Sequence, residues 1–182
     1  SALAHRGIPL QSGYCGAKHA IKGFTESVVA ELTHEGSAVA ISLVDMPALN
    51  TVQFSWVRSK LEQHPQPVPT IFQPEAGARA VVAVANTPRR RTWVGEPTVM
   101  TVLGNMFVPR FMDWYLSKAA WDGQFAPDKT GPRLPDNLFD PAPGDQGARG
   151  AFSDRAKDDS VQLWGIRNRR LVAGAGAALG AG

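Results

Sequence analysis

"SGYCGAKHAIKGFTESVVAELTHEG" (residues 12–36) decides the fold, because it reads as one long amphipathic helix. Apolar residues recur along it at helical spacing, namely Ala17, Ala20, Ile21, Phe24, Val28 and Leu32. With Ser12 as a candidate N-cap and Gly36 as a stop, the pattern predicts a helix over about residues 13–35. Tyr14 and Lys18 stand four residues apart in it, so their side chains lie on the same side, at the edge of the apolar stripe. The phenol and the ammonium can therefore point at one spot beside the core.

The segment after this helix predicts a buried strand and a long loop. "AVAISLV" (38–44) is an unbroken apolar run of strand length, which is typical of a strand buried on both faces in a parallel sheet. "MPALNT" (46–51) then opens a loop that stays rich in proline up to residue 74. We expect one short helix inside this loop, near residues 54–61.

The next part of the chain predicts further helices and one strand. A helix is expected from Pro74 to just before Pro88, followed by a short strand at "TWVG" (92–95). Strand, helix and strand with tight connections predict a right-handed crossover in a parallel sheet. Two more helices are expected at 98–107 and 109–121, divided by a proline that cannot continue the hydrogen-bond ladder.

The composition changes at Asp122, where a segment rich in Pro, Gly and Asp begins. It ends in the low-complexity run "VAGAGAALGAG" (172–182). We therefore divide the chain into a domain at 1–121 and a C-terminal extension at 122–182 that wraps over the surface or is partly disordered.

Composition excludes several classes of protein. The 182 residues, 43% of them hydrophobic, suffice for one domain with a real core. The net charge is only +3, and the basic runs at 89–91 and 167–170 read as solvated turns, so nucleic acid is not an expected partner. No apolar run is long enough to span a bilayer. The apolar stretch at 98–112 could rest on a membrane surface, but no basic face accompanies it, which disfavours a membrane partner.

Cysteine and histidine usage predicts neither a disulfide nor a metal site. Cys15 is the single cysteine, so no internal disulfide can form, and a reducing cytoplasm fits best. Cys15 points away from Tyr14 around the helix and is expected to pack in the core. No Cys/His spacing of the zinc type occurs, and all four histidines read as surface or loop residues: His5, His19, His34 and His64.

Ser1 changes the interpretation of the tyrosine and lysine pair. A Tyr-x-x-x-Lys spacing alone is common and would by itself be read as ordinary helix surface. Ser1 stands thirteen residues before Tyr14, however, and the helix leads into a buried strand and a Pro-containing loop that ends in Thr51. From Ser1 to about Gly95 this arrangement resembles the second half of the short-chain dehydrogenase/reductase family (SDR). The resemblance implies the C-terminal part of a Rossmann-like doubly wound parallel sheet, with the N-terminal nucleotide-binding half absent.

The resemblance also implies a reaction and a role for each residue. It predicts an NAD(P)-dependent oxidoreductase that interconverts a carbonyl and a secondary alcohol by hydride transfer, with Ser1, Tyr14 and Lys18 as catalytic residues. Tyr14 would be the acid/base, Ser1 would hold the substrate oxygen, and Lys18 would also bind the nicotinamide ribose. Ionising a phenol at neutral pH costs about 4 kcal/mol, and a neighbouring ammonium lowers this cost, which explains the pairing.

The cofactor contacts implied by the resemblance are Tyr14, Lys18, Pro47, Ala48 and Thr51. The loop departs from the family pattern, because Pro47 occupies the place of the usual glycine and Met46 that of the usual proline. Thr51 could instead cap the next helix. The glycine motif and the selector between NAD and NADP are expected upstream of Ser1, so the sequence does not distinguish the two cofactors.

Several expectations concern the molecule as a whole. The opening on Ser1 suggests a fragment, and the isolated chain is expected to be inactive. The alternative is a non-catalytic relative that serves as a cofactor sensor or a scaffold. The expected substrate is a small-molecule ketone or alcohol of fairly apolar character, up to a bulky one. Its binding wall is expected in residues 52–72 and 100–114, with Phe54, Trp56, Phe72, Met106 and Phe107, and the alternative is that these residues pack the core or the C-terminal tail. The resemblance further implies a homodimer or homotetramer built on the helix that carries Tyr14.

Overall fold

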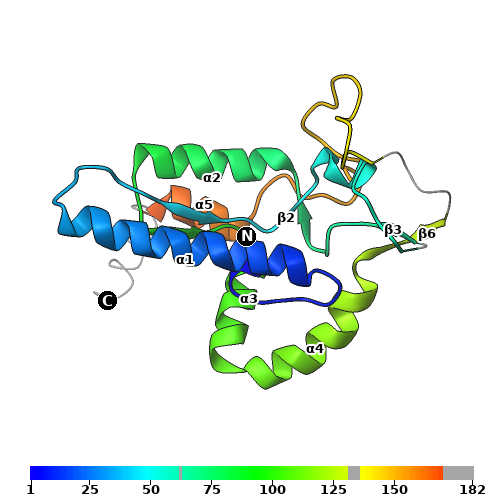
Figure 1. Ribbon diagram of the computed structural model, residues 1–182, viewed down its shortest axis with the longest axis horizontal. Coiled ribbons are helices and arrows are strands. Elements are labelled where there is room, and N and C mark those ends of the chain that lie inside the picture. Colours follow the sequence, from blue (N-terminus) through cyan, green and yellow to red (C-terminus); the bar gives the residue numbers. More distant parts are fainter. Residues whose placement is uncertain (62, 131–135, 170–182) are drawn as a thin grey trace, which may run out of the picture.

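The computed structural model describes residues 1–61, 63–130 and 136–169 (Figure 1). Its longest element is helix α1 (Ser12–His34), which confirms the predicted helix to within a residue at each end. The chain leaves α1 through Gly36, whose φ of 66° is the left-handed conformation that glycine favours. Gln11 is the N-cap and makes no side-chain capping bond, so Ser12 is the first helical residue and not the cap.

Prolines set the start of the other long helices. Helix α2 spans Pro74–Asn86, α3 spans Glu96–Phe107 and α4 spans Pro109–Asp122, each with a proline in its first turn. A proline suits this position because its missing N–H has no intrahelical partner there. The predicted helices and the break before Pro109 are therefore confirmed. In Figure 1, α3 and α4 extend to one side of α1, and α2 lies on the other.

The strands form short pairs, and the fold is mixed α/β. Strand β1 (Leu43–Asp45) pairs in parallel with β5 (Arg91–Trp93), and β2 (Ala48–Leu49) pairs in parallel with β4 (Ile71–Phe72). A third pair, β3 (Gln63–Pro65) with β6 (Phe125–Thr130), is antiparallel. Parallel strands separated by a helix are consistent with part of a Rossmann-like fold.

The strand predicted at 38–44 is largely wrong. The observed β1 is three residues long and starts at Leu43, while residues 38–42 belong to no strand, and Val39 is 63% exposed. In the described part of the chain β1 pairs only with β5. Apolar residues become a ladder strand only where a neighbour supplies hydrogen-bond partners, and residues 38–42 have no such neighbour here.

The long loop also differs from its prediction. In place of a helix near 54–61, the structure has a single 3₁₀ turn, η2 (Val52–Ser55). The sequence analysis missed the short strands β2 and β4 in the same loop. Two-residue strands carry no readable alternation, and they exist here because long-range partners align them.

The core lies between α2, β4 and the C-terminal helix α5 (Val161–Arg167). Its buried members are Phe72, Ala76, Ala80, Val94 and Leu163. The chain before α5 runs along β4, where the Lys157 N–H donates to the Ile71 carbonyl at 2.9 Å and the Gln73 N–H donates to the Lys157 carbonyl at 2.8 Å. The division at residue 121 stays a prediction, but the segment after it contributes Leu163, which is fully buried. Residues 131–135 and the run at 172–182 lie outside the described residues.

Candidate functional site

Tyr14 and Lys18 lie together on the first turns of α1. The Lys18 Nζ atom is 5.2 Å from the centroid of the Tyr14 ring, so the predicted juxtaposition of phenol and ammonium is confirmed. Tyr14 is 46% exposed, which leaves its hydroxyl open to a small molecule. In the described part of the chain Lys18 forms no ion pair with a carboxylate. The pair therefore keeps both of its polar groups available for a ligand.

Ser1 caps the short 3₁₀ turn η1 (Ala2–Ala4). Its Oγ accepts a hydrogen bond from the Leu3 N–H at 3.2 Å. A hydroxyl that accepts one bond still has its own O–H to donate, so the Ser1 hydroxyl can hold a substrate oxygen. The turn that carries Ser1 packs against α1, the helix that carries Tyr14 and Lys18.

Asp45 is a buried carboxylate at the end of β1, and the sequence analysis did not single it out. It is 4% exposed, and its Oδ2 lies 3.0 Å from the His5 Nε2. Its Oδ1 lies 3.4 Å from the Ser1 amino nitrogen, and the Arg91 Nε is 3.8 Å from Oδ2. A buried charge needs such partners to offset its desolvation. The signal that could have found it is an acidic residue directly after an apolar strand.

His5 is therefore not the surface residue that was predicted. Its side chain is only 10% exposed, it bonds Asp45, and its ring lies edge-on to Trp93 at 6.5 Å between centroids. Sequence spacing could not show this, because the two partners are 40 residues apart. His19 and His34 are exposed as expected, although the His19 ring also lies within bonding distance of the Cys15 carbonyl, and His64 is half-buried in β3. Cys15 is 5% exposed, which confirms its expected packing role.

A chain of ion pairs ties α1 to this region. Arg91 of β5 bonds Glu26 of α1 at 2.7 Å, and Lys22 bonds the same carboxylate at 3.1 Å. The Arg91 guanidinium, and then the Lys22 ammonium, lower the pKa of the Glu26 carboxyl. Because Arg91 also approaches Asp45, the helix that carries Tyr14 is linked to the amino end of β5 and to Asp45 at the carboxyl end of β1.

The loop at 46–51 starts beside the serine turn and then enters the core. The Met46 carbonyl accepts a hydrogen bond from the Ala2 N–H at 3.1 Å. Ala48 belongs to β2, and the Thr51 N–H donates to the Leu49 carbonyl at 2.9 Å. Pro47 lies close to Gly95, where an added Cβ would be 3.4 Å from the proline Cγ.

Thr51 lies beneath the C-terminal segment. A Cβ added at Gly150 would be 2.5 Å from the Thr51 carbonyl oxygen, so only glycine fits at this crossing. Thr51 also precedes η2, as its N-cap residue, without a side-chain capping bond. Of the predicted cofactor contacts, the structure brings Tyr14 and Lys18 together and places Thr51 against residue 150.

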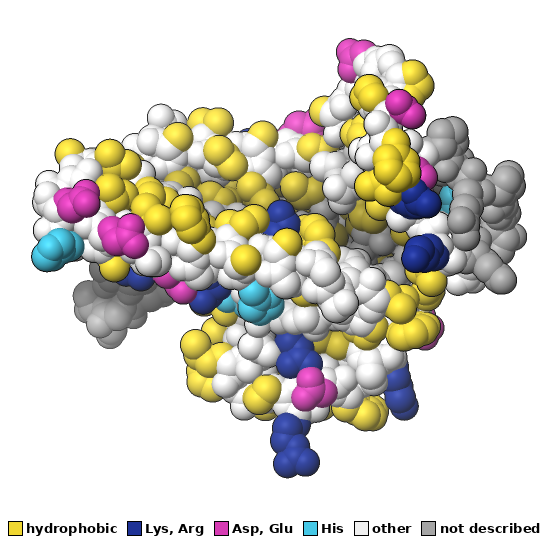
Figure 2. Space-filling view, viewed as in Figure 1, with side chains coloured by type: hydrophobic (Ala, Val, Ile, Leu, Met, Phe, Trp, Pro, Cys, Tyr) yellow, Lys and Arg dark blue, Asp and Glu magenta, His cyan; other side chains and the backbone are white. Residues whose placement is uncertain are grey.

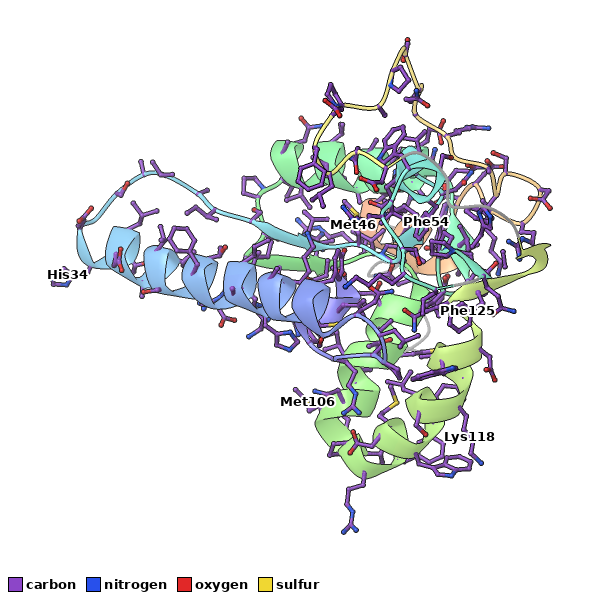
Figure 3. The ribbon with its side chains drawn as sticks, turned by 45° about the vertical axis from the view of Figure 1, so that its right-hand side comes forward. His34, Met46, Phe54, Met106, Lys118 and Phe125 are labelled. Atoms are coloured by element: carbon purple, nitrogen blue, oxygen red, sulfur yellow. The ribbon has the colours of Figure 1, made fainter. Side chains whose placement is uncertain are left out.

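The predicted apolar binding wall is not assembled. Phe72 is 1% exposed and belongs to the core, and Phe54 packs edge-on against Phe152 at 5.9 Å. Met106 and Phe107 are 65% and 72% exposed at the end of α3, and Figure 3 shows Met106 on the outside of that helix. These side chains therefore lie in separate parts of the molecule and do not line one common surface.

A surface hollow of about 270 Å³ lies at the other end of α1. It is lined by residues such as Val29, Leu32, Ile41, Pro88 and Arg89. At a rise of 1.5 Å per residue, Val29 is about 17 Å along the helix from Lys18. The hollow is therefore separate from the candidate site.

The residues present can be tested for their fit to a nicotinamide cofactor. The exposed Tyr14 phenol and the half-buried Lys18 ammonium suit the hydroxyl groups of a ribose, whereas the Asn50 and Thr51 backbone amides already donate within the fold. Nowhere in the described ranges does a cluster of three His, Cys, Asp or Glu side chains gather as a metal site would need. None of the described helices is both long enough and apolar enough to cross a membrane.

Comparison with known proteins gives one informative similarity. The chain is similar to a Bacillus subtilis protein named "Uncharacterized oxidoreductase YxnA", with 32% identity over 142 residues. The match covers 77% of this chain and 40% of the relative, so the chain spans well under half of that protein's length. No protein-family model matches the sequence, and no solved structure matches it. The similarity supports a relationship to oxidoreductases in general.

Proposed function

We propose that this chain contains the active-site helix of an NAD(P)-dependent oxidoreductase of the short-chain dehydrogenase/reductase type. The observation that carries the proposal is the Lys18 ammonium, 5.2 Å from the ring of an exposed Tyr14. The Ser1 turn packs against the same helix. The similarity to a protein named an oxidoreductase supports the same class of reaction. The reaction is the interconversion of a carbonyl compound and a secondary alcohol.

Each side chain has a distinct task in this proposal. The Ser1 hydroxyl donates a hydrogen bond to the substrate oxygen and so fixes its position. The Tyr14 hydroxyl gives a proton to that oxygen in the reductive direction and takes it back in the oxidative one. Lys18 stabilises the phenolate by its charge and binds the nicotinamide ribose. The bound NAD or NADP supplies or accepts the hydride.

The tested variant is Lys18→Met in the natural full-length protein, with residues numbered as here. We expect kcat/KM for carbonyl reduction to fall about 100-fold, because the charge that stabilises the phenolate is gone. The dissociation constant of the nicotinamide cofactor should rise about tenfold, as expected for one lost hydrogen bond to a charged group. Steady-state kinetics and a fluorescence titration with NADH and NADPH measure the two effects.

Lys22→Met is the matched control, one turn further along α1. Lys22 pairs with Glu26 and should leave both measurements within about twofold of the wild type. Full turnover by Lys18→Met would rule out the assigned role. Cofactor binding without any turnover on a broad panel of ketones and alcohols would favour the cofactor-sensing alternative.

We also propose that the full-length protein forms a dimer or tetramer through α1. Ile21 and Phe24 on this helix are 51% and 71% exposed, and Figure 2 shows hydrophobic side chains along its surface. Large exposed apolar side chains in a row are suited to a symmetric contact with a second copy. Light scattering at micromolar concentration should show an assembly that Phe24→Glu dissociates. Phe139→Glu, at a residue that is 84% exposed in the C-terminal segment, is the control, and a monomeric wild type would refute the proposal.

A further inference from the structure

Ser1 is positioned by residues other than its proposed catalytic partners, Tyr14 and Lys18. Its turn, η1, is only three residues long. A 3₁₀ turn of this length does not hold itself in place, because one or two hydrogen bonds cannot offset the entropy of ordering it. The orientation of the Ser1 hydroxyl must therefore be fixed by contacts that η1 makes with other elements.

Those contacts come from two places. One is Asp45 with the residue after it, and the other is Asn105 of α3, whose Nδ2 donates to the His5 carbonyl at 3.0 Å. His5 is the residue that caps the end of η1, and its backbone N–H donates to the Ala2 carbonyl at 3.0 Å. The Nε2 atom of its ring is hydrogen-bonded to the Asp45 Oδ2 at 3.0 Å. The Ala2 N–H donates to the Met46 carbonyl at 3.1 Å. Asp45 lies in β1, which pairs with β5, and so has a fixed place in the fold. Figure 3 shows Met46 in the middle of the molecule, where β1 ends.

The bond between His5 and Asp45 is shielded from water. Asp45 is 4% exposed, and the His5 side chain is 10% exposed with the edge of Trp93 against it. The charged side chain beside the carboxylate is Arg91, which Glu26 holds from α1. In such surroundings a hydrogen bond to a carboxylate is stronger and more directional than at the surface.

We propose that His5 is a positioning residue, held by Asp45, that fixes the Ser1 hydroxyl opposite Tyr14 and Lys18. This inference rests on the proposed function, since it assigns His5 a role through the substrate contact of Ser1. His5 itself does not touch substrate or cofactor. Its loss leaves the chemistry in place but lets the serine turn move, and a shift of about 1 Å in a substrate contact costs up to about 100-fold in rate.

The test is a double-mutant cycle between His5 and Ser1 in the natural full-length protein. His5→Phe keeps a ring against Trp93 and removes the bond to Asp45. We expect kcat/KM to fall about 10- to 100-fold with an unchanged cofactor dissociation constant. In the Ser1→Ala background the same substitution should change kcat/KM by less than about twofold, because the group that His5 positions is already gone. A merely structural role would give the same loss in both backgrounds.

Two further variants complete the cycle. His5→Gln places an amide nitrogen at the position of the ring Nε2. Its kcat/KM should lie, on a logarithmic scale, at least halfway from the value of His5→Phe back to that of the wild type. His34→Phe, at the exposed far end of α1, is the control for removing a histidine. If His5→Phe does not fold, His5→Asn, whose shorter amide does not reach Asp45, takes its place in both backgrounds.

The outcomes separate the two proposals. Equal losses in the wild-type and Ser1→Ala backgrounds, or no loss from any His5 variant, would overturn the role of His5 and leave the proposed function intact. Full activity of Ser1→Ala, together with full activity of Lys18→Met, would instead refute the proposed function itself.

Discussion

Tyr14→Phe in the natural full-length protein is expected to lower kcat for carbonyl reduction by about a thousandfold, which is typical for the loss of a general acid/base. This corresponds to about 4 kcal/mol of transition-state stabilisation. The phenylalanine ring keeps the contact with the Lys18 ammonium, so the affinity for NAD or NADP should stay within about threefold. Stopped-flow or steady-state loss of NADPH absorbance, together with a cofactor titration, measures the two effects separately.

Tyr115→Phe is the matched control, because Tyr115 is the chain's other tyrosine and is similarly exposed, at 48%. It stacks on Phe111 of α4, and its hydroxyl has no role in the proposal. Its variant should turn over at the wild-type rate. Full activity in Tyr14→Phe would remove the assigned acid/base chemistry whatever the other variants do.

Asn50→Ala should destabilise the fold by on the order of 4 kcal/mol, the largest effect on stability that we expect. Asn50 is fully buried, and its amide donates to the Gln73 Oε1 and the Ser153 Oγ, both at 3.0 Å. Its Oδ1 accepts the Phe152 N–H at 3.0 Å. Alanine loses all three bonds, leaves a cavity and takes a donor from the buried Gln73. Chemical unfolding of the full-length protein measures the loss.

The same variant should loosen the C-terminal segment first. Residues 150–153 are held to the loop after β2 by Asn50 and by the close crossing of Gly150 over Thr51. Limited proteolysis should therefore cut Asn50→Ala in this segment before the rest of the chain. Asn86→Ala, at the exposed end of α2, is the control and should stay within about 0.5 kcal/mol of the wild type. A loss below about 1 kcal/mol for Asn50→Ala would contradict this account.

Local sequence determined the helices and the central pair of the candidate site. The apolar spacing in residues 12–36 and the glycine at its end define α1, and the prolines at 74, 97 and 109 start the next three helices. These signals act over one or two helical turns, where backbone sterics and neighbouring side chains suffice. For the same reason Tyr14 and Lys18 had to meet, since four residues of helix bring them to one side.

Only the tertiary structure decided which groups surround that pair. His5 contacts Asp45 across 40 residues of sequence, and Asn50 contacts Ser153 across 103. No pattern in the sequence predicts either contact. Leu163, in a segment that the composition presents as an extension, completes the core beside Phe72. The strand expected at 38–44 shows the converse, because this apolar run pairs only over its last two residues, Leu43 and Val44, where β5 lies beside it. Hydrogen bonds between distant segments, and the burial that makes them strong, depend on the whole chain being folded and cannot be read from neighbouring residues.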